Sequence, residues 1–162
     1  MATVPVNAAV KPLEWLLGKW TADAGKAIYP TMKDFTYHEE LEFTHVGQPN
    51  LCYRLNTWNP ETKAPMHRES GFLRIQPETN KVAFLTAHNL GITELSEGEV
   101  NGQELKLQST NICRMSFAKE PATQKIHRTF TRSGDELVQI VLMETDKTPL
   151  TKHLEVHYKK AS

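Results

Sequence analysis

The sequence predicts an all-β fold, an antiparallel barrel of about ten strands of the calycin or fatty-acid-binding-protein type, with a short N-terminal helical turn. Three observations predict it. Apolar and polar residues alternate through most of the chain after Trp20, turn-forming residues separate the alternating segments, and the connections are short. An open sheet of this size would leave two unpaired edges, which closure into a barrel removes.

A β-sandwich is the alternative way to close the same set of strands. The two folds differ in what they imply about function. A barrel with this many strands encloses more space than side chains easily fill, so it implies an internal ligand, whereas a sandwich does not.

The N-terminal part divides into two segments. Residues 1–11 are expected to form a flexible arm, and residues 12–162 the barrel domain. Residues 12–18 are expected to form one or two helical turns, because the segment has Pro at its start, Gly at its end and apolar residues between them. A helix this short is not stable alone, so we expect it to cover one end of the barrel.

The strand pattern continues to the C-terminus. Alternation is clearest around residues 34–46, 51–55, 82–86, 105–107, 126–130, 137–143 and 154–158. Turn-forming sequences lie at residues 47–50, 59–62, 76–80, 101–102 and 133–135. Short connections of this kind predict a meander, in which strands adjacent in sequence are adjacent in the sheet.

Bulk composition excludes several functions. The chain has 162 residues, enough for one domain, and its 19 Lys and Arg balance 19 Asp and Glu. Without a basic stripe, neither nucleic acid nor a membrane is an expected partner. Cys52 and Cys113 can form at most one disulfide and are expected to be buried, reduced thiols. No signal peptide begins the sequence, so a cytoplasmic location, with the nucleus as a second compartment, is expected.

Motifs for common metal and catalytic sites are absent. His153 and His157 are four residues apart, and on a strand this spacing spans about 13 Å, too far to share one ion. The sequence has no HExxH, paired CxxC or acidic calcium loop, so a zinc or calcium site is not expected. No Gly-x-Ser-x-Gly elbow marks a nucleophile. Glu39, Glu40 and Glu42 are expected to lie on a solvated strand face.

Six short motifs nevertheless occur in a fixed order between residues 12 and 158. They are Leu17-Gly18-Lys19-Trp20, Tyr29-Pro30-Thr31, Phe35-x-Tyr37-x-Glu39-Glu40, His45-x-Gly47-x-Pro49, Pro65-Met66-His67-x-Glu69-x-Gly71-Phe72 and His153-Leu154-x-x-x-Tyr158. With these motifs the chain resembles the nitrobindin family, small β-barrels that hold a haem b. One imidazole is enough to anchor an iron that arrives in a macrocycle.

The resemblance implies roles for four residues. His153, in the closing motif, would be the axial ligand of the haem iron. Thr31 would contact the haem, and Met66 and His67 would lie near its other face. From the residues alone, Thr31 could equally be a hydroxyl that caps a turn or strand start, and Met66 a core residue that fills a gap.

The resemblance also implies an activity. Family members carry a ferric haem b, one per chain, that binds nitric oxide and isomerises peroxynitrite to nitrate, which limits tyrosine nitration. His67 would steer the anion or hold a water molecule. The chain departs from many members at Ala22 and Ala24, where they have glycine. In this it is similar to the animal branch of the family.

Two other functions stay open. The barrel could be a non-catalytic carrier of a fatty acid or other small apolar ligand, with Arg114 or Arg128 as the cationic anchor for a carboxylate. It could also be an interaction domain with an exposed apolar patch. Haem uptake separates the first function from these two.

Overall fold

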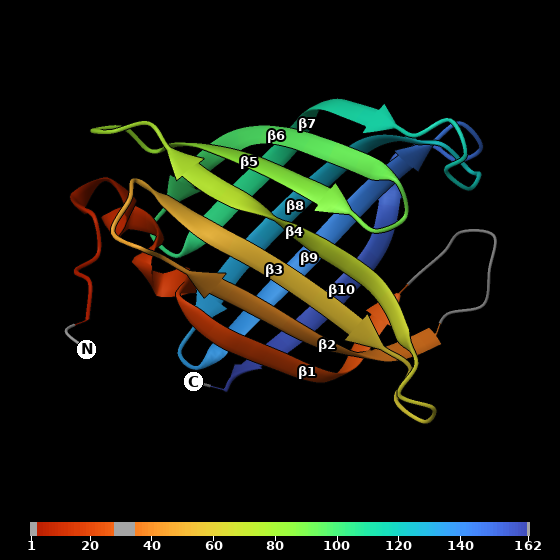
Figure 1. The fold of residues 1–162 in the computed structure, drawn as a ribbon, viewed down its shortest axis with the longest axis horizontal. Coiled ribbons are helices and arrows are strands. Elements are labelled where there is room, and N and C mark those ends of the chain that lie inside the picture. The colour runs from red at the N-terminus through yellow and green to blue at the C-terminus, as the bar shows by residue number, and fades with distance from the viewer. Residues whose placement is uncertain (1–2, 28–34, 162) are drawn as a thin grey trace.

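The computed structural model describes residues 3–27 and 35–161, which fold into a closed antiparallel barrel (Figure 1). Each strand pairs with the next along the chain, and β1 pairs with β10 to complete the circle. This closed order confirms the predicted barrel and excludes the sandwich. The ten strands of the described residues are β1 (Gly18–Ala27), β2 (Phe35–Thr44), β3 (Asn50–Trp58), β4 (Pro65–Ile75), β5 (Lys81–His88), β6 (Ile92–Asn101), β7 (Glu104–Arg114), β8 (Thr123–Ser133), β9 (Glu136–Thr145) and β10 (Thr151–Lys160).

A 3-10 helix, η1 (Ala8–Leu16), precedes the barrel. It begins four residues before the predicted segment 12–18, and Pro12 lies inside it rather than at its start. The sequence signal that was missed is Asn7, whose side-chain oxygen accepts a hydrogen bond from the backbone N–H of Ala9 at 2.9 Å and caps the helix. No helix among the described residues is long and apolar enough to span a membrane.

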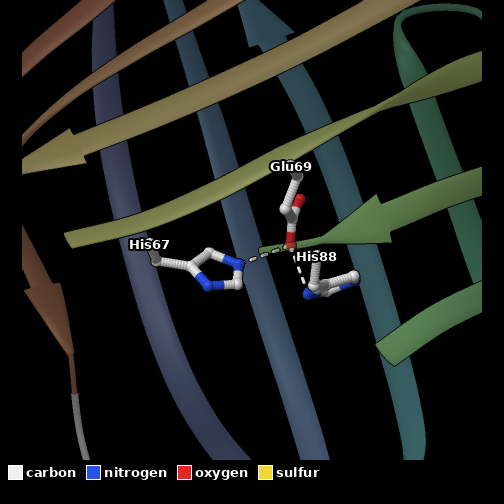
Figure 2. Close-up of side chains that lie close together, drawn as sticks. All are labelled: His67, Glu69 and His88. Atoms are coloured by element: carbon white, nitrogen blue, oxygen red, sulfur yellow. Dashed lines mark hydrogen bonds and ion pairs between the residues drawn. The ribbon is translucent and has the colours of Figure 1, made fainter. Parts of the chain in front are cut away.

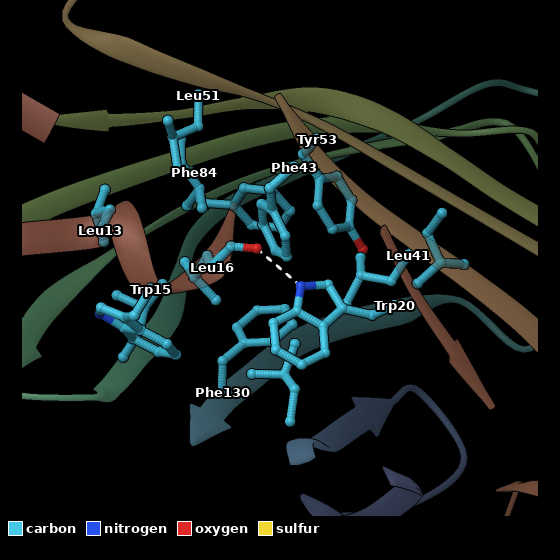
Figure 3. Packing of buried hydrophobic residues seen from close by; sticks show 14 of the residues in the cluster. Leu13, Trp15, Leu16, Trp20, Leu41, Phe43, Leu51, Tyr53, Phe84 and Phe130 are labelled. Carbon is cyan, nitrogen blue, oxygen red and sulfur yellow. Dashed lines mark hydrogen bonds between the residues drawn. The ribbon is translucent and has the colours of Figure 1, made fainter. Parts of the chain in front are cut away.

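The helix covers one end of the barrel, as predicted (Figure 1). Leu13 and Leu16 are fully buried there, and Trp20 Nε1 donates to Leu16 O at 2.8 Å (Figure 3). Arg132 Nη1 donates to Trp15 O at 2.7 Å and ties β8 to the helix. Unpaired carbonyls at the helix end are thus satisfied by the barrel wall.

Apolar side chains fill the interior next to the helix. Large buried residues of this cluster include Trp20, Leu41, Phe43, Leu51, Leu73, Phe84, Leu105 and Phe130. Their rings pack edge to face, with 5.8 Å between the centroids of Phe43 and Phe130. This half of the barrel is therefore a packed core.

The opposite end contains an irregularity in β10. Lys152 pairs with Leu142 and Leu154 pairs with Val141, so His153 is an extra residue in a β-bulge. Ala27, the last residue of β1, pairs with Leu154 on the other side. Because β1 begins beside the helix, His153 lies at the end of the barrel away from it.

The cysteines differ from expectation in one respect. Both are unpaired thiols, but Cys52 is only half-buried and Cys113 is exposed. Cys52 lies between the buried Leu51 and Tyr53, so the strand alternation turns it outward. The prediction that both thiols are buried is therefore wrong.

Candidate functional site

Beyond the apolar core, four ionisable side chains point into the barrel. Glu39, Glu69, Glu94 and Arg128 are each at most 5% exposed and come from β2, β4, β6 and β8. Buried charges of this kind are stable only when they are paired and hydrogen-bonded. They form a polar floor between the packed core and the end that carries His153.

Arg128 is the centre of this floor. Its Nη2 atom lies 2.7 Å from Glu69 Oε1 and 2.8 Å from Glu94 Oε1, and its Nε atom lies 3.1 Å from Glu94 Oε2. Nη1 donates to Gln139 Oε1 at 3.3 Å. Burial alone would lower the pKa of Arg128, but the two carboxylates hold it well above its usual value. The guanidinium is thus a permanent cation between two anions.

These contacts bear on the carrier function. Arg128 was one of two predicted anchors for a ligand carboxylate, but two carboxylates of the protein already bind it. Arg114, the other, donates to Ala118 O at 3.2 Å and is bonded to the loop that follows β7. The structure therefore gives the carrier function no free cationic anchor among the described residues at the predicted positions.

Three further side chains surround the Glu69 carboxylate: His67 and Tyr53 are hydrogen-bonded to it, and His88 lies at ion-pair distance (Figure 2 shows the two imidazoles). His67 Nε2 and His88 Nδ1 lie 3.0 and 3.2 Å from its Oε1 atom. Tyr53 donates its hydroxyl to Oε2 at 2.6 Å. Burial would raise the pKa of Glu69, but Arg128 and the two imidazoles hold it well below its usual range. Glu69 is therefore an ionised acceptor at neutral pH.

His67, Glu69 and His88 are residue types that bind transition metals, and one ligand atom from each lies within 4.8 Å of the others. In this structure the positive charge near Glu69 comes from Arg128, whose Nη2 is 2.7 Å away. His88 also faces Glu94, with 3.2 Å between Nε2 and Oε1. The group is best described as part of one hydrogen-bonded network.

The network continues from Arg128 to Glu39. Gln139 Nε2 donates to the hydroxyl of Tyr158 at 2.9 Å, and this hydroxyl donates in turn to Glu39 Oε1. Burial raises the pKa of Glu39 to about 8, against the opposing effect of the Tyr158 hydrogen bond. Glu39 is therefore a neutral acid at pH 7.

The prediction that Glu39 lies on a solvated face with Glu40 and Glu42 is wrong for Glu39, which is 1% exposed. Its position in β2 explains why. Glu39 lies between the buried Tyr37 and Leu41 on the inward face, whereas Glu40 and Glu42 alternate with them and face outward.

His153 is suited to bind a metal in a cofactor. The bulge in β10 carries it, and the side chain is partly buried. Burial lowers the pKa of His153 to about 4, and the positive charges of His67 and Arg128 add to the shift. Its imidazole is therefore neutral at pH 7 and keeps a lone pair, the form that coordinates iron.

The other predicted site residues fall into two groups. His67 leaves 32% of its side chain exposed, and Met66 is partly buried against the core cluster. The electrostatic effect of His67 on His153 places these two imidazoles at the same end of the barrel. Thr31 lies outside the described residues. Ala22 is buried in the core cluster, beside a register shift between β1 and β2.

Glu69, Glu94 and His88 were not predicted to be members of the site. A signal for two of them was present. Glu69 has the same parity in β4 as the buried Leu73, and His88 the same parity in β5 as the buried Phe84. Extending the alternation of inward-facing residues along each strand predicts that both side chains face the barrel interior. It does not predict that they lie beside Arg128.

A closed barrel with a packed half, a polar floor and a neutral imidazole at its other end defines a cofactor-binding β-barrel. The chain belongs to the family described as "THAP4-like, heme-binding beta-barrel domain", whose profile matches residues 9–160. The resemblance to nitrobindins is confirmed.

Relatives with this fold come from animals, plants and bacteria. The chain is 50% identical over 159 residues to the human protein named "Peroxynitrite isomerase THAP4", covering 97% of this chain and 28% of that protein. It is 37% identical over 153 residues to an Arabidopsis thaliana protein named "Peroxynitrite isomerase Rv2717c", covering 93% of this chain and 88% of that protein. The crystal structure of Rv2717c from M. tuberculosis superposes with a TM-score of 0.87 at 32% identity, over 98% of this chain and 100% of that one.

Proposed function

We propose that this domain binds one haem b through His153 and isomerises peroxynitrite to nitrate, and that it also binds nitric oxide. The observation that carries the proposal is the neutral imidazole of His153, which a bulge presents at the end of a haem-binding fold away from the packed core. Relatives named peroxynitrite isomerase support the reaction. The chain spans 28% of the human relative, so the proposal concerns this domain.

The position of each residue in the barrel determines its proposed role. His153 would hold the iron, while Met66 and His67 would lie on the other side of the ligand pocket and Thr31 would add a contact. Bound haem would supply a ferric iron that acts as a Lewis acid toward the ligand. Peroxynitrite and nitrate contain the same atoms and charge, so the isomerisation needs no external proton or electron. What the protein must provide is confinement, and the polar floor closes the pocket on the core side.

We also propose that the protein works in the cytoplasm or the nucleus. The two unpaired thiols, one of them exposed, support a reducing compartment.

The first test is a titration of the haem-free protein with hemin, followed by absorption spectroscopy. We expect a Soret band that saturates at one haem per chain. Replacing His153 with Ala should abolish this band at stoichiometric loading. His157→Ala is the matched control, because His157 lies on the same strand but is exposed and paired with Glu136. Equal spectra for the two variants would refute the assignment of His153.

The second test measures the reaction. Peroxynitrite is mixed with the haem-loaded protein in a stopped-flow instrument, and nitrate yield and nitration of added tyrosine are determined. We expect faster decay, a higher share of nitrate and less nitrotyrosine than in buffer. A protein that binds haem but leaves decay and products unchanged would contradict the isomerase function. A Soret shift on adding nitric oxide tests the second ligand separately.

A further inference from the structure

The wall formed by β3, β4 and β5, which lie side by side in Figure 1, contains a hollow on its outer face. Ser70 and Ala87 pair across β4 and β5, and both of these short side chains are exposed. Arg54 pairs with Ser70 from β3, and Arg68 lies two residues before Ser70 on the same face of β4. Two long side chains therefore flank a floor of two short ones. The hollow measures about 460 Å³, the size of a site for a small organic molecule.

The polar side chains that line the hollow have unused hydrogen-bond donors. Among the described residues, no partner forms a hydrogen bond or ion pair with the guanidinium group of Arg54 or Arg68. In the same part of the chain, the Ser70 hydroxyl and the Asn56 side-chain amide are also unpaired. Guanidinium groups only donate, and a hydroxyl or amide can donate as well. The hollow therefore presents four donor groups and two positive charges to a ligand.

The acidic residues around the hollow do not neutralise it. The outward positions of β4 and β5 carry no Asp or Glu. Glu42 is the neighbour of Arg54 on β2, but the two form no ion pair within the described residues. Glu40, on the same strand, instead lies 3.7 Å from Lys19. On the other side, the neighbour on β6 is the uncharged Thr93. The hollow is therefore suited to an anion.

An apolar row borders the hollow. Phe72 pairs with Leu85, and Leu85 pairs with Leu95, so the three side chains form a line across β4, β5 and β6. All three are large apolar residues that stay exposed, by 45%, 36% and 48%. Phe72 and Leu85 are each two residues along their strands from Ser70 and Ala87, a distance of about 7 Å. An apolar group attached to an anion in the hollow can therefore contact this row.

We propose that the hollow is a second ligand site, which binds a small phosphomonoester whose organic part is apolar. A phosphomonoester carries close to two negative charges at pH 7 and matches two guanidinium groups, whereas a carboxylate carries one. Guanidinium forks also match the geometry of phosphate oxygens. The organic part would lie on Phe72 and Leu85.

Two features of the barrel define this ligand further. Every strand among the described residues is paired on both sides, so no strand edge is free to bind a peptide backbone, and the ligand is a free small molecule. The hollow also lies on the outside of the wall whose inner face carries Glu69. The site is therefore separate from the proposed haem pocket and does not depend on it.

Phenyl phosphate is the probe, because it joins a phosphomonoester to an apolar ring. It is titrated into the nitrogen-15-labelled chain at pH 7 without haem, and backbone amide signals are followed by NMR. We expect saturable shifts at Ser70, Ala87 and Asn89, which line the hollow. Inorganic phosphate should bind about threefold more weakly, because it has no group to cover the apolar row. Benzoate has the same ring but one charge, and should bind about tenfold more weakly.

Four variants assign the binding to the hollow. Arg54→Gln and Arg68→Gln should each weaken binding of phenyl phosphate by about tenfold, because each removes a charge-assisted hydrogen bond. Arg74→Gln is the matched control, since Arg74 is an exposed arginine on the same face of β4 outside the hollow. Its effect should stay below about twofold, because salt screens a charge at that distance. Phe72→Ala should remove the preference for phenyl phosphate over inorganic phosphate.

Several results would overturn the proposal. Binding of phenyl phosphate that is equal in wild type, Arg54→Gln and Arg68→Gln, or that shows no saturable shift at millimolar concentration, excludes the site. An equal loss in Arg74→Gln would show attraction by net charge alone. Benzoate that binds as tightly as phenyl phosphate contradicts the choice of a phosphomonoester. A capped phosphotyrosine tripeptide that binds more tightly than phenyl phosphate contradicts a free small molecule as the ligand.

Discussion

At the scale of single residues, two acidic side chains buried in the same barrel have opposite protonation states. Glu69 is ionised because Arg128 and two imidazoles surround it, whereas burial keeps Glu39, which accepts a hydrogen bond from the Tyr158 hydroxyl, neutral. Both side chains are buried, so the difference comes from the charges around them and not from exposure.

Replacing Glu39 with Gln should stabilise the protein at high pH. The pKa of Glu39 is about 8 in the folded state and 4.5 ordinarily, so between these values the folded chain binds a proton that the unfolded chain has lost. The contribution of Glu39 to stability is therefore complete below pH 4.5 and is lost as pH rises to about 8, by roughly 1 kcal/mol per pH unit. A neutral Gln avoids this loss.

The measurement is urea unfolding of haem-free wild type and Glu39→Gln between pH 5 and pH 8.5. The free energy of unfolding of the variant, relative to the wild type, should increase with pH. Glu42→Gln is the control, since Glu42 lies on the outer face of the same strand. A difference between Glu39→Gln and wild type that stays constant with pH would show that Glu39 is ionised in the folded state.

The same residue shows what sequence can and cannot predict. Alternation predicts which face a side chain takes, and applied strictly it puts Glu39 beside Tyr37 and Leu41 inside the barrel. It does not predict that Tyr158, 119 residues later, will donate to this acid. Partners across the barrel depend on the register of every strand between them, and no local pattern encodes that register.

At the scale of elements, β4 and β5 are in unusually close contact at Gly71, which pairs with Thr86. A Cβ added at Gly71 would lie 1.9 Å from Leu85 O and 2.7 Å from Thr86 Cα. Only glycine allows this approach, which lies two residues from Glu69 on the same strand. The close contact therefore helps to fix the spacing of the strands that carry Glu69 and His88.

Gly71→Ala should push these strands apart and destabilise the protein by about 2 kcal/mol or more, because an added methyl in a packed interior forces the backbone to shift. For a domain of this size that corresponds to a fall in Tm of roughly 4–8 °C. Thermal unfolding followed by circular dichroism measures it. The neighbouring Ser70→Ala, on the exposed face, is the control. Equal Tm values for both variants would mean that the strands absorb the methyl without strain.

The β10 bulge could not be predicted from the sequence. The spacing in the closing motif predicts a strand, and His153 and His157 do lie on one strand. An unbroken alternation, however, would turn His153 outward with His157, since the inward positions are those of Val156 and Tyr158. The extra residue changes the parity, and only pairing with Leu142 and Val141 reveals it.

At the scale of the whole molecule, topology was the most predictable property. Short turns between alternating segments leave few choices other than a meander, and ten strands close it. The polar floor and its hydrogen-bonded partners were not predictable, because they come from six strands, two in the first half of the chain and four in the second. It is this floor that separates the packed half from the half available to a cofactor.

The floor and His153 together predict the pH dependence of stability of the haem-free protein. Glu69 and Glu94 have lowered pKa values, so their contribution is present above pH 4.5 and is lost in acid. His153 has a pKa of about 4 when folded and 6.5 ordinarily, so its burial costs least above pH 6.5 and stability rises between these values. Glu39 acts in the opposite direction from pH 4.5 to about 8.

Together these contributions predict a curve of stability against pH with three parts. Stability should rise steeply up to about pH 4.5 and change little from about 4.5 to 6.5, where Glu39 and His153 offset each other. It should fall from about 6.5 to 8, mainly because of Glu39 and to a smaller extent because the raised pKa of the exposed His157 acts in the same direction. Chemical denaturation in steps of half a pH unit measures it. In Glu39→Gln most of the fall should disappear, and stability should keep rising to about pH 6.5. A wild-type maximum near pH 8 would contradict the shift assigned to Glu39, because a neutral Glu39 in the folded barrel requires that stability decline before that pH.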